Sequence, residues 1–248
     1  VKITLSGKFR EGVYAKDFAL HILGMLRDED VDYTLVEYHG EGVKELSISD
    51  RMTIANISAE AGLKTSVFPP DDRLADYFGD YAVQGVWADE NAVYHKEFTL
   101  DLGQVMPLVM VTHQLNDVKS VAEAETLEIQ QGLIGACSNG RIEDLRVVAR
   151  ILEGKRLASG FQLSVIPASY DIYIQAREEG LVDKITKAGA SVLGASCGPC
   201  LGSSHMLNAD TKRFITTTNS NSMQRMSEVG VEKYIASPAT VAATALTG

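Results

Sequence analysis

The sequence predicts an α/β protein in which mostly parallel strands are covered by helices. Two observations carry this prediction. Strand-like and helix-like segments alternate along nearly all of the 248 residues. This alternation is most regular in the second half of the chain, where short apolar strands are each followed by an amphipathic segment, the rhythm of βαβ units.

The first half of the chain begins with a strand and continues in the same alternation. Strands are expected at residues 1–5, 33–38, 64–68 and 92–102, and helices at 15–26, 51–61 and 71–78. Residues 33–38 are rich in β-branched and aromatic side chains, which favour strands. Ser49 and Asp50 are expected to cap the second helix, and Gly62 to end it.

A polar, proline-containing stretch at residues 106–117 is expected to be a linker between two domains, residues 1–110 and 111–248. After it the alternation becomes sharper. Strands are expected at 132–136, 161–166 and 213–218, and helices at 142–152, 170–179, 182–188 and 239–246. Both domains are therefore expected to be α/β units with parallel sheets.

Charge and hydropathy exclude several classes of partner. The formal net charge of −10 argues against nucleic acid, because phosphate binding depends on Lys and Arg. It also disfavours docking on anionic lipid, and no stretch approaches the roughly 20 apolar residues of a membrane span. Three cysteines form no disulfide framework of the secreted type, so a reducing, cytoplasmic location is expected.

The surroundings of the three cysteines in the sequence indicate a ligand site. Cys137 follows an apolar strand and precedes a helix, and Cys197 and Cys200 form Cys-Gly-Pro-Cys in a glycine-rich stretch. Carboxyl ends of parallel strands and helix N-termini favour anionic groups, including thiolates. Glycines let the backbone wrap closely around a sulfur-bearing ligand.

Four interpretations of these thiols remain open at this point. They could be unrelated buried cysteines. Cys197 and Cys200 could exchange disulfides as in thioredoxin, although no Trp stands directly before them. Zinc could be bound by the three thiolates and His205, giving a metal-stabilised binding module. Finally, three thiolates could hold an iron–sulfur cluster and leave one iron open as a Lewis acid.

Several motifs along the chain resemble those of one family in the same order. Residues 134–146, Ile-Gly-Ala-Cys-Ser-Asn-Gly-Arg-Ile-Glu-Asp-Leu-Arg, resemble the first cluster-ligand motif of the aconitase superfamily. Residues 197–202, Cys-Gly-Pro-Cys-Leu-Gly, resemble its second motif, and residues 51–62 a third. Residues 12–17 and 237–248 fit the same register. Within the superfamily, the large subunits of the isopropylmalate dehydratase and homoaconitase type look most similar.

The resemblance implies a fold, an activity and a set of site residues. The fold would be aconitase-like, with three-layer αβα domains. The activity would be a hydro-lyase reaction on a 2-hydroxy di- or tricarboxylate, such as 3-isopropylmalate in leucine biosynthesis. Cys137, Cys197 and Cys200 would hold a [4Fe–4S] cluster. Asn56 and Glu60, spaced i, i+4 on one helix face, would be catalytic, and Arg225 and Asn219 would bind substrate carboxylates. Asn139 would help cap the next helix.

The sequence departs from the family pattern in places that concern the substrate. Ser220 stands where an arginine is usual, Ser222 where an aromatic is common, and Ala136 where a serine is common. The family's N-terminal portion, with its acid/base groups, has no counterpart, and none of the five histidines, His113 and His205 included, fits a catalytic motif. The swivelling domain would belong to a separate small subunit, so this chain alone is expected to be inactive.

Overall fold

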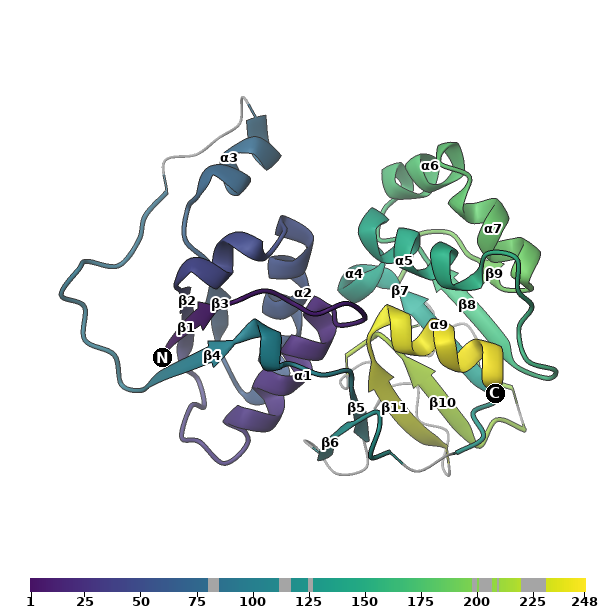
Figure 1. Cartoon of the computed structure of the whole chain (residues 1–248), viewed down its shortest axis with the longest axis horizontal. Helices are drawn as coiled ribbons and strands as arrows, with labels where there is room; N and C mark the ends of the chain where they lie inside the picture. Colours follow the sequence, from purple (N-terminus) through teal and green to yellow (C-terminus); the bar gives the residue numbers. More distant parts are fainter. Residues whose placement is uncertain are drawn as a thin grey trace. The chain divides into compact units, whose positions relative to one another are not determined.

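The computed structural model describes residues 1–79, 85–111, 117–124, 127–197, 200, 207–208, 210–219 and 231–248. These residues form two compact units, Val1–Met106 and Pro107–Gly248. Each unit has its own sheet, drawn in Figure 1 in purple to blue for the first and teal to yellow for the second. The α/β class with mostly parallel sheets, expected from the sequence, is confirmed.

The first unit is built on a four-stranded parallel sheet in the order β3-β2-β1-β4. Its strands are β1 (Lys2–Ser6), β2 (Leu35–His39), β3 (Thr65–Val67) and β4 (Glu97–Asp101), and its helices are α1 (Ala15–Leu26), α2 (Ile48–Ser58) and α3 (Asp72–Phe78). Short 3₁₀ segments lie at Glu41–Glu45, Ala59–Ala61 and Leu102–Gln104. Helices α1 and α2 pack against each other.

Alternation along β1 and β2 separates the two faces of this sheet. Ile3, Leu5 and Tyr38 are almost fully buried, whereas their neighbours Lys2 and Glu37 stay partly exposed. Such period-two burial is what a sheet with one packed face requires. The buried face therefore supplies the core of this unit.

Helix α2 begins earlier than the sequence predicted. Its cap is Ser47, whose hydroxyl accepts from the backbone N–H of Asp50, while the Asp50 carboxylate accepts from the N–H of Ser47. The expected cap at Ser49 and Asp50 is wrong, because this reciprocal capping box places Asp50 three residues inside the helix.

The second unit carries a seven-stranded sheet in the order β6-β5-β11-β10-β7-β8-β9. Its strands are β5 (Leu108–Val111), β6 (Asp117–Ser120), β7 (Gln131–Gly135), β8 (Gln162–Ile166), β9 (Ser191–Val192), β10 (Arg213–Thr216) and β11 (Glu232–Ala236). Strands β11, β10, β7, β8 and β9 are parallel; β5 pairs antiparallel with β11 and with β6. The expectation of a linker over 106–117 is wrong, because Leu108–Val111 is an apolar strand whose preceding Pro107 lies just outside it.

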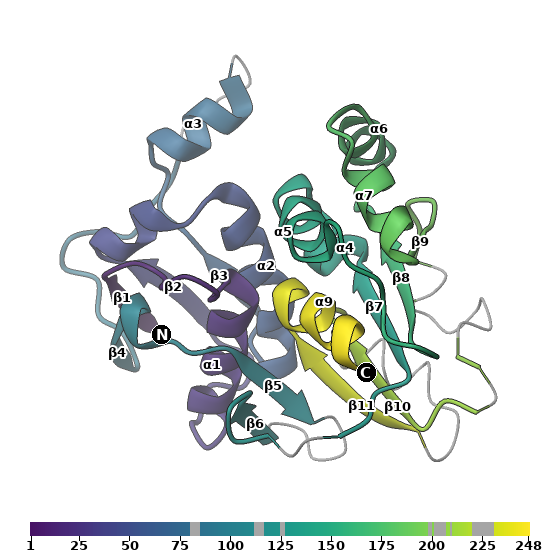
Figure 2. The ribbon, with the colours of Figure 1, turned by 45° about the vertical axis from the view of Figure 1, so that its right-hand side comes forward.

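The helices of the second unit are α4 (Ala136–Asn139), α5 (Ile142–Leu152), α6 (Tyr170–Glu178), α7 (Leu181–Ala188) and α9 (Pro238–Thr247). Helix α5 contacts α6, α7 and α9, so these helices form one layer beside the sheet (Figure 2). The apolar core lies between that layer and residues such as Ile134, Val165 and Ile215 of the strands. No helix within the described ranges is long and apolar enough to cross a membrane.

Candidate functional site

The order of the strands in the second sheet marks the place where a ligand site is expected. From β7 the chain moves outward through β8 to β9, then returns to β10 on the other side of β7 and continues to β11. The direction of winding therefore reverses between β7 and β10. In open α/β sheets, ligands bind outside the carboxyl ends of the strands at such a switch point.

The turn after β7 puts Cys137 at this edge through an unusual backbone path. Gly135 has a φ of 120°, and a side chain there would bring its Cβ to 1.9 Å from the carbonyl oxygen of Ile166. Ala136 follows with a φ of 55°, in the left-handed region that non-glycine residues rarely adopt. Such strain persists only where the surroundings hold it, often at functional sites. Cys137, the second residue of α4, is exposed.

Neighbouring strands hold this turn in place. The backbone N–H of Gly135 donates to the buried hydroxyl of Thr217 at 2.9 Å, just beyond the end of β10. On the other side, the N–H of Ala168, after β8, donates to the carbonyl of Gly140 at 2.8 Å. The Cys137 turn is thus fastened to both strands that flank β7.

Asp144 joins the end of the turn to helix α5. Its carboxylate accepts from the side-chain amide of Asn139 at 3.0 Å and from the backbone N–H of Arg141 at 3.1 Å. Burial raises the pKa of Asp144 to about 6, although the bond from Asn139 and the charge of Arg141 oppose this rise. Asn139 is itself buried, and it orients the turn through Asp144; the cap of α5 is formed by the Asp144 carboxylate.

Cys197 and Cys200 reach the same edge from β9. Cys197 is exposed and follows β9 by five residues, whereas Cys200 is 5% exposed. Burial, and after it the charges of Cys137 and Cys197, raise the pKa of the Cys200 thiol to about 12. The charges of Cys137 and Cys197 both act on Cys200, so Cys200 lies near both of these thiols although Cys137 comes from a distant part of the sequence.

The chemistry of this donor set fits a cationic cofactor. Three neighbouring thiolates are costly without a cation, and a bound metal deprotonates a coordinating thiol outright. Within the described ranges, no group of three or more His, Cys, Asp or Glu side chains is arranged to hold one metal ion. A structural zinc is bound by four ligands, so the three thiols alone would not complete a zinc site. The zinc interpretation also needs His205, which lies outside the described residues.

The residues expected to bind substrate are placed only in part. Asn219 is half-buried and follows β10, at the same carboxyl edge as Cys137 on the neighbouring strand. Arg225, Ser220 and Ser222 lie outside the described residues, as does His113.

The expected catalytic pair lies on the first unit. Asn56 is on α2, but Glu60 is in the 3₁₀ turn Ala59–Ala61, and both are half-buried. The expectation that both sit on one regular helix face is wrong, because the helix tightens before Gly62, which ends it with a φ of 80°. The i, i+4 spacing therefore does not describe their geometry.

Three residues that hold the turn were missed from the sequence: Arg141, Asp144 and Thr217. Asp144 was readable as the third residue of a helix, where a carboxylate can accept from the cap. The run Thr216-Thr217-Thr218 at a strand end is also a signal in the sequence. In the structure all three residues are buried. Only the fold shows that Thr217 faces Gly135, 82 residues away.

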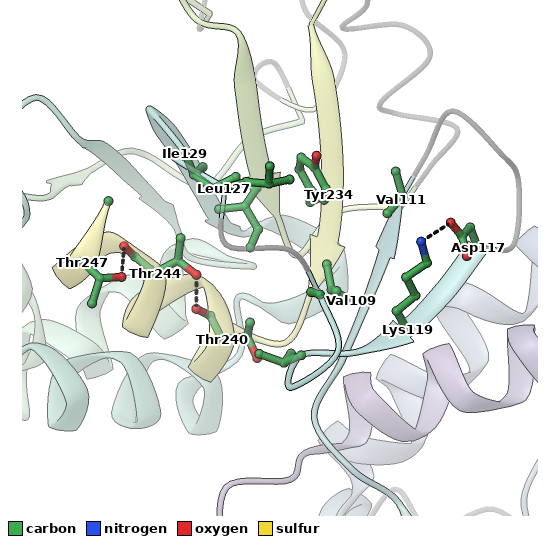
Figure 3. A pocket seen from close by; sticks show the side chains of 14 residues that line it. Val109, Val111, Asp117, Lys119, Leu127, Ile129, Tyr234, Thr240, Thr244 and Thr247 are labelled. Carbon is green, nitrogen blue, oxygen red and sulfur yellow. Dashed lines mark hydrogen bonds and ion pairs between the residues drawn. The ribbon is translucent and has the colours of Figure 1, made fainter.

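A separate pocket of about 420 Å³ lies elsewhere in the second unit (Figure 3). Its walls include Val109, Val111 and Ile129, and Thr240, Thr244 and Thr247 line the α9 side. The Thr244 and Thr247 hydroxyls donate to carbonyls one turn earlier, and Lys119 pairs with Asp117 at 3.0 Å. The three cysteines do not line this pocket, so it is distinct from the carboxyl edge.

Comparison with known proteins finds similar sequences among dehydratase large subunits. The 3-isopropylmalate dehydratase large subunit of Lachnoclostridium phytofermentans is 42% identical, and the 2,3-dimethylmalate dehydratase large subunit of Eubacterium barkeri is 41% identical. Large subunit 2 of the 3-isopropylmalate dehydratase of Archaeoglobus fulgidus is 38% identical. Each alignment covers 100% of this chain but 60% of the relative, so the chain spans well under two thirds of their length.

A solved structure shows the same fold at low sequence identity. Aconitase X of Thermococcus kodakaraensis, in its holo-form, has a TM-score of 0.56 and 11% identity, over 98% of this chain and 54% of that chain. The sequence profile of the aconitase family (aconitate hydratase) matches residues 1–126 and 110–248, which together span the whole sequence. This chain therefore belongs to the aconitase family.

Proposed function

We propose that this chain is the cluster-binding core of the large subunit of a [4Fe–4S]-dependent hydro-lyase. The observation that supports this most directly is the convergence of Cys137, Cys197 and Cys200 beside the β7–β10 switch point. The relatives reported above are dehydratase large subunits, which agrees with a reaction that removes and re-adds water.

The three thiolates would hold the cluster, which when bound supplies an open iron able to act as a Lewis acid on a hydroxyl. The chain's own residues would fix the ligands: Gly135 gives the turn its backbone path, and Thr217 and Asp144 hold the turn from both sides. Asn56 and Glu60 are the proposed catalytic residues of the first unit.

The proposed substrate is a 2-hydroxy dicarboxylate with an alkyl substituent, of the 3-isopropylmalate type. The names of the relatives support this class, since both 3-isopropylmalate and 2,3-dimethylmalate are alkyl malates. Arg225 and Asn219 would bind carboxylates, Arg225 through its two-pronged guanidinium. Ser220 in place of a second arginine favours a dicarboxylate over a tricarboxylate such as homocitrate, the homoaconitase alternative.

The complete enzyme is proposed to include a small subunit with the swivelling domain. The relatives are named large subunits, which implies a small-subunit partner for them. A cytoplasmic role in leucine biosynthesis follows if the substrate is 3-isopropylmalate.

The cluster is tested by anaerobic reconstitution with iron and sulfide, followed by iron analysis and electron paramagnetic resonance of the dithionite-reduced protein. We expect about four irons per chain, and loss of the spectrum in each of Cys137→Ser, Cys197→Ser and Cys200→Ser. Indifference to all three substitutions would refute the assignment. Insulin reduction that survives Cys137→Ser would favour the thiol–disulfide alternative. Stoichiometric zinc in the protein purified without added metal would favour the metal-stabilised binding module.

The substrate is tested with the complete large subunit paired with its small subunit. We expect hydration and dehydration of 3-isopropylmalate or 2,3-dimethylmalate, and weak or no turnover of homocitrate. A pair that carries the cluster but acts on none of these acids would contradict the hydro-lyase proposal and leave the cluster assignment standing.

A further inference from the structure

The one-turn helix α4 leaves carbonyl groups beside Cys137 that need donors. A helix of four residues, Ala136–Asn139, cannot pair its own last carbonyls, because the chain turns at Gly140. Arg141 supplies the donors. Its Nη1 donates to the carbonyl of Cys137 at 3.0 Å, and its Nη2 donates to the carbonyl of Ser138.

We propose that Arg141 is the positioning residue of the Cys137 ligand and that its charge raises the reduction potential of the cluster. This inference rests on the proposed function. A guanidinium bonded to the backbone of a ligand residue restricts where the thiolate can point. It also adds a fixed positive charge beside a site where three thiolates gather, and net charge is one of the factors that set cluster potentials.

Arg141 is itself held in position. Its backbone N–H donates to Asp144, and the same carboxylate accepts from the amide of Asn139. The side chain of Asn139 also accepts from the hydroxyl of Ser138 at 3.1 Å. Bonds to ligand-bearing turns from such outer residues are the usual means by which proteins fix metal ligands.

The forked shape of arginine matters for this role. Two nitrogens of one planar group reach two successive carbonyls, which a lysine ammonium on a flexible stem cannot reproduce with the same geometry. Lysine does keep the positive charge. Substitution by lysine and by glutamine therefore separates the positioning effect from the charge effect.

The experiment uses the reconstituted 248-residue chain and two measurements that do not depend on activity. Iron loss to a chelator reports how well the ligands are held, and an electron paramagnetic resonance titration gives the midpoint potential. For Arg141→Gln we expect about tenfold faster iron loss and a more negative potential. For Arg141→Lys we expect faster iron loss with a potential close to that of the wild type.

Arg146→Gln is the matched control, since Arg146 lies nearby on helix α5, which Arg141 precedes, but its guanidinium bonds Glu179. This control should match the wild type in both measurements. The proposal is overturned if either effect is missing in Arg141→Gln. If that variant does not fold, as judged by circular dichroism, wild-type iron loss in Arg141→Lys overturns it. Failure of the wild type itself to take up iron would instead refute the proposed function.

Discussion

The hydroxyl of Thr217 accepts a hydrogen bond of 2.9 Å from the backbone N–H of Gly135, and so joins the ends of β10 and β7. Thr217 also donates its own backbone N–H to the carbonyl of Leu133 at 3.0 Å. The two strands on either side of the switch point are therefore tied beyond their regular pairing. Cys137 follows β7 and Asn219 follows β10, so both residues start from the same edge of the sheet, which these hydrogen bonds hold in place.

Thr217→Val should destabilise the second unit by about 1–3 kcal/mol, because it leaves the buried N–H of Gly135 without an acceptor while keeping the side-chain volume. Urea unfolding measures the loss. Thr247→Val is the control: its exposed hydroxyl donates to Thr244 at 3.3 Å, and its loss should cost under about 0.5 kcal/mol. Equal losses in the two variants would show that the Gly135 bond is unimportant.

Gly135→Ala should reduce stability far more than the same substitution at a glycine that also has a positive φ but has open surroundings. Its Cβ would meet the Ile166 carbonyl oxygen at 1.9 Å, so β7 and β8 must move apart. Gly154 has a φ of 71° with nothing within 4 Å of an added Cβ, and Gly154→Ala should cost only about 1–2 kcal/mol. The thermal midpoints of the two variants give the comparison, and similar midpoints would contradict the clash.

Asp144 should make stability fall as the pH rises. Its pKa is raised to about 6 from 3.8 by burial, so the folded state holds a proton more tightly than the unfolded state. The contribution of Asp144 to stability is fully present below about pH 4. It is lost as the pH rises through about 6, a change of about 1–3 kcal/mol in the free energy of unfolding.

The variant Asp144→Asn should flatten this slope in urea unfolding measured from pH 4 to pH 7. Glu143→Gln removes an exposed carboxylate of the same helical turn and should keep it. Unchanged slopes in Asp144→Asn would place the titration elsewhere.

Asp71→Asn should destabilise the first unit by about 3 kcal/mol, because it leaves the buried guanidinium of Arg51 without its carboxylate. Arg51 is 5% exposed, and its two terminal nitrogens donate to the two oxygens of Asp71. Asparagine keeps the cap that Asp71 gives to Leu74, so the pair is tested alone.

The matched control is Glu179→Gln, which breaks the exposed pair with Arg146 and should cost only about 0.2–1 kcal/mol. The hydrogen bond and charge of Arg51 also lower the pKa of Asp71. The contribution of the Arg51–Asp71 pair to stability is present above the ordinary pKa of the carboxyl. It is lost as the pH falls through the lowered pKa of Asp71. If the stability of Asp71→Asn and of the wild type fell equally as the pH was lowered, the assignment would be contradicted.

Local patterns were enough to predict most elements but not the pairing at the edge of the second sheet. Helix α5 was predicted with its observed bounds, since its apolar residues recur at helical spacing and Leu152 ends the run. Strand β11 was missed because it begins with two charged residues, Glu232 and Lys233, which are not typical of an apolar strand. Lys233 is nevertheless buried, through tertiary packing that the local sequence does not indicate. Strand β9 has two residues, too few for any periodic signal.

The candidate site was predictable where chemistry and position coincide in sequence. Cys137 follows a strand directly, so its place at the carboxyl edge could be expected before the fold was known. Arg141 and Thr217 could not be found in this way, because their roles depend on hydrogen bonds to a turn whose backbone path is set by Gly135 and Ala136.

The two-residue length of β9 gives the three thiols unequal mechanical support. Cys137 is anchored at the middle of the sheet, whereas Cys197 and Cys200 follow β9, one of the two edge strands of the described sheet, which pairs with β8. Peripheral strands with few pairing bonds are the parts of a fold that open first. Heat or denaturant should therefore separate β9 from the sheet while the Cys137 turn is still folded, so that the site loses its support first at this edge.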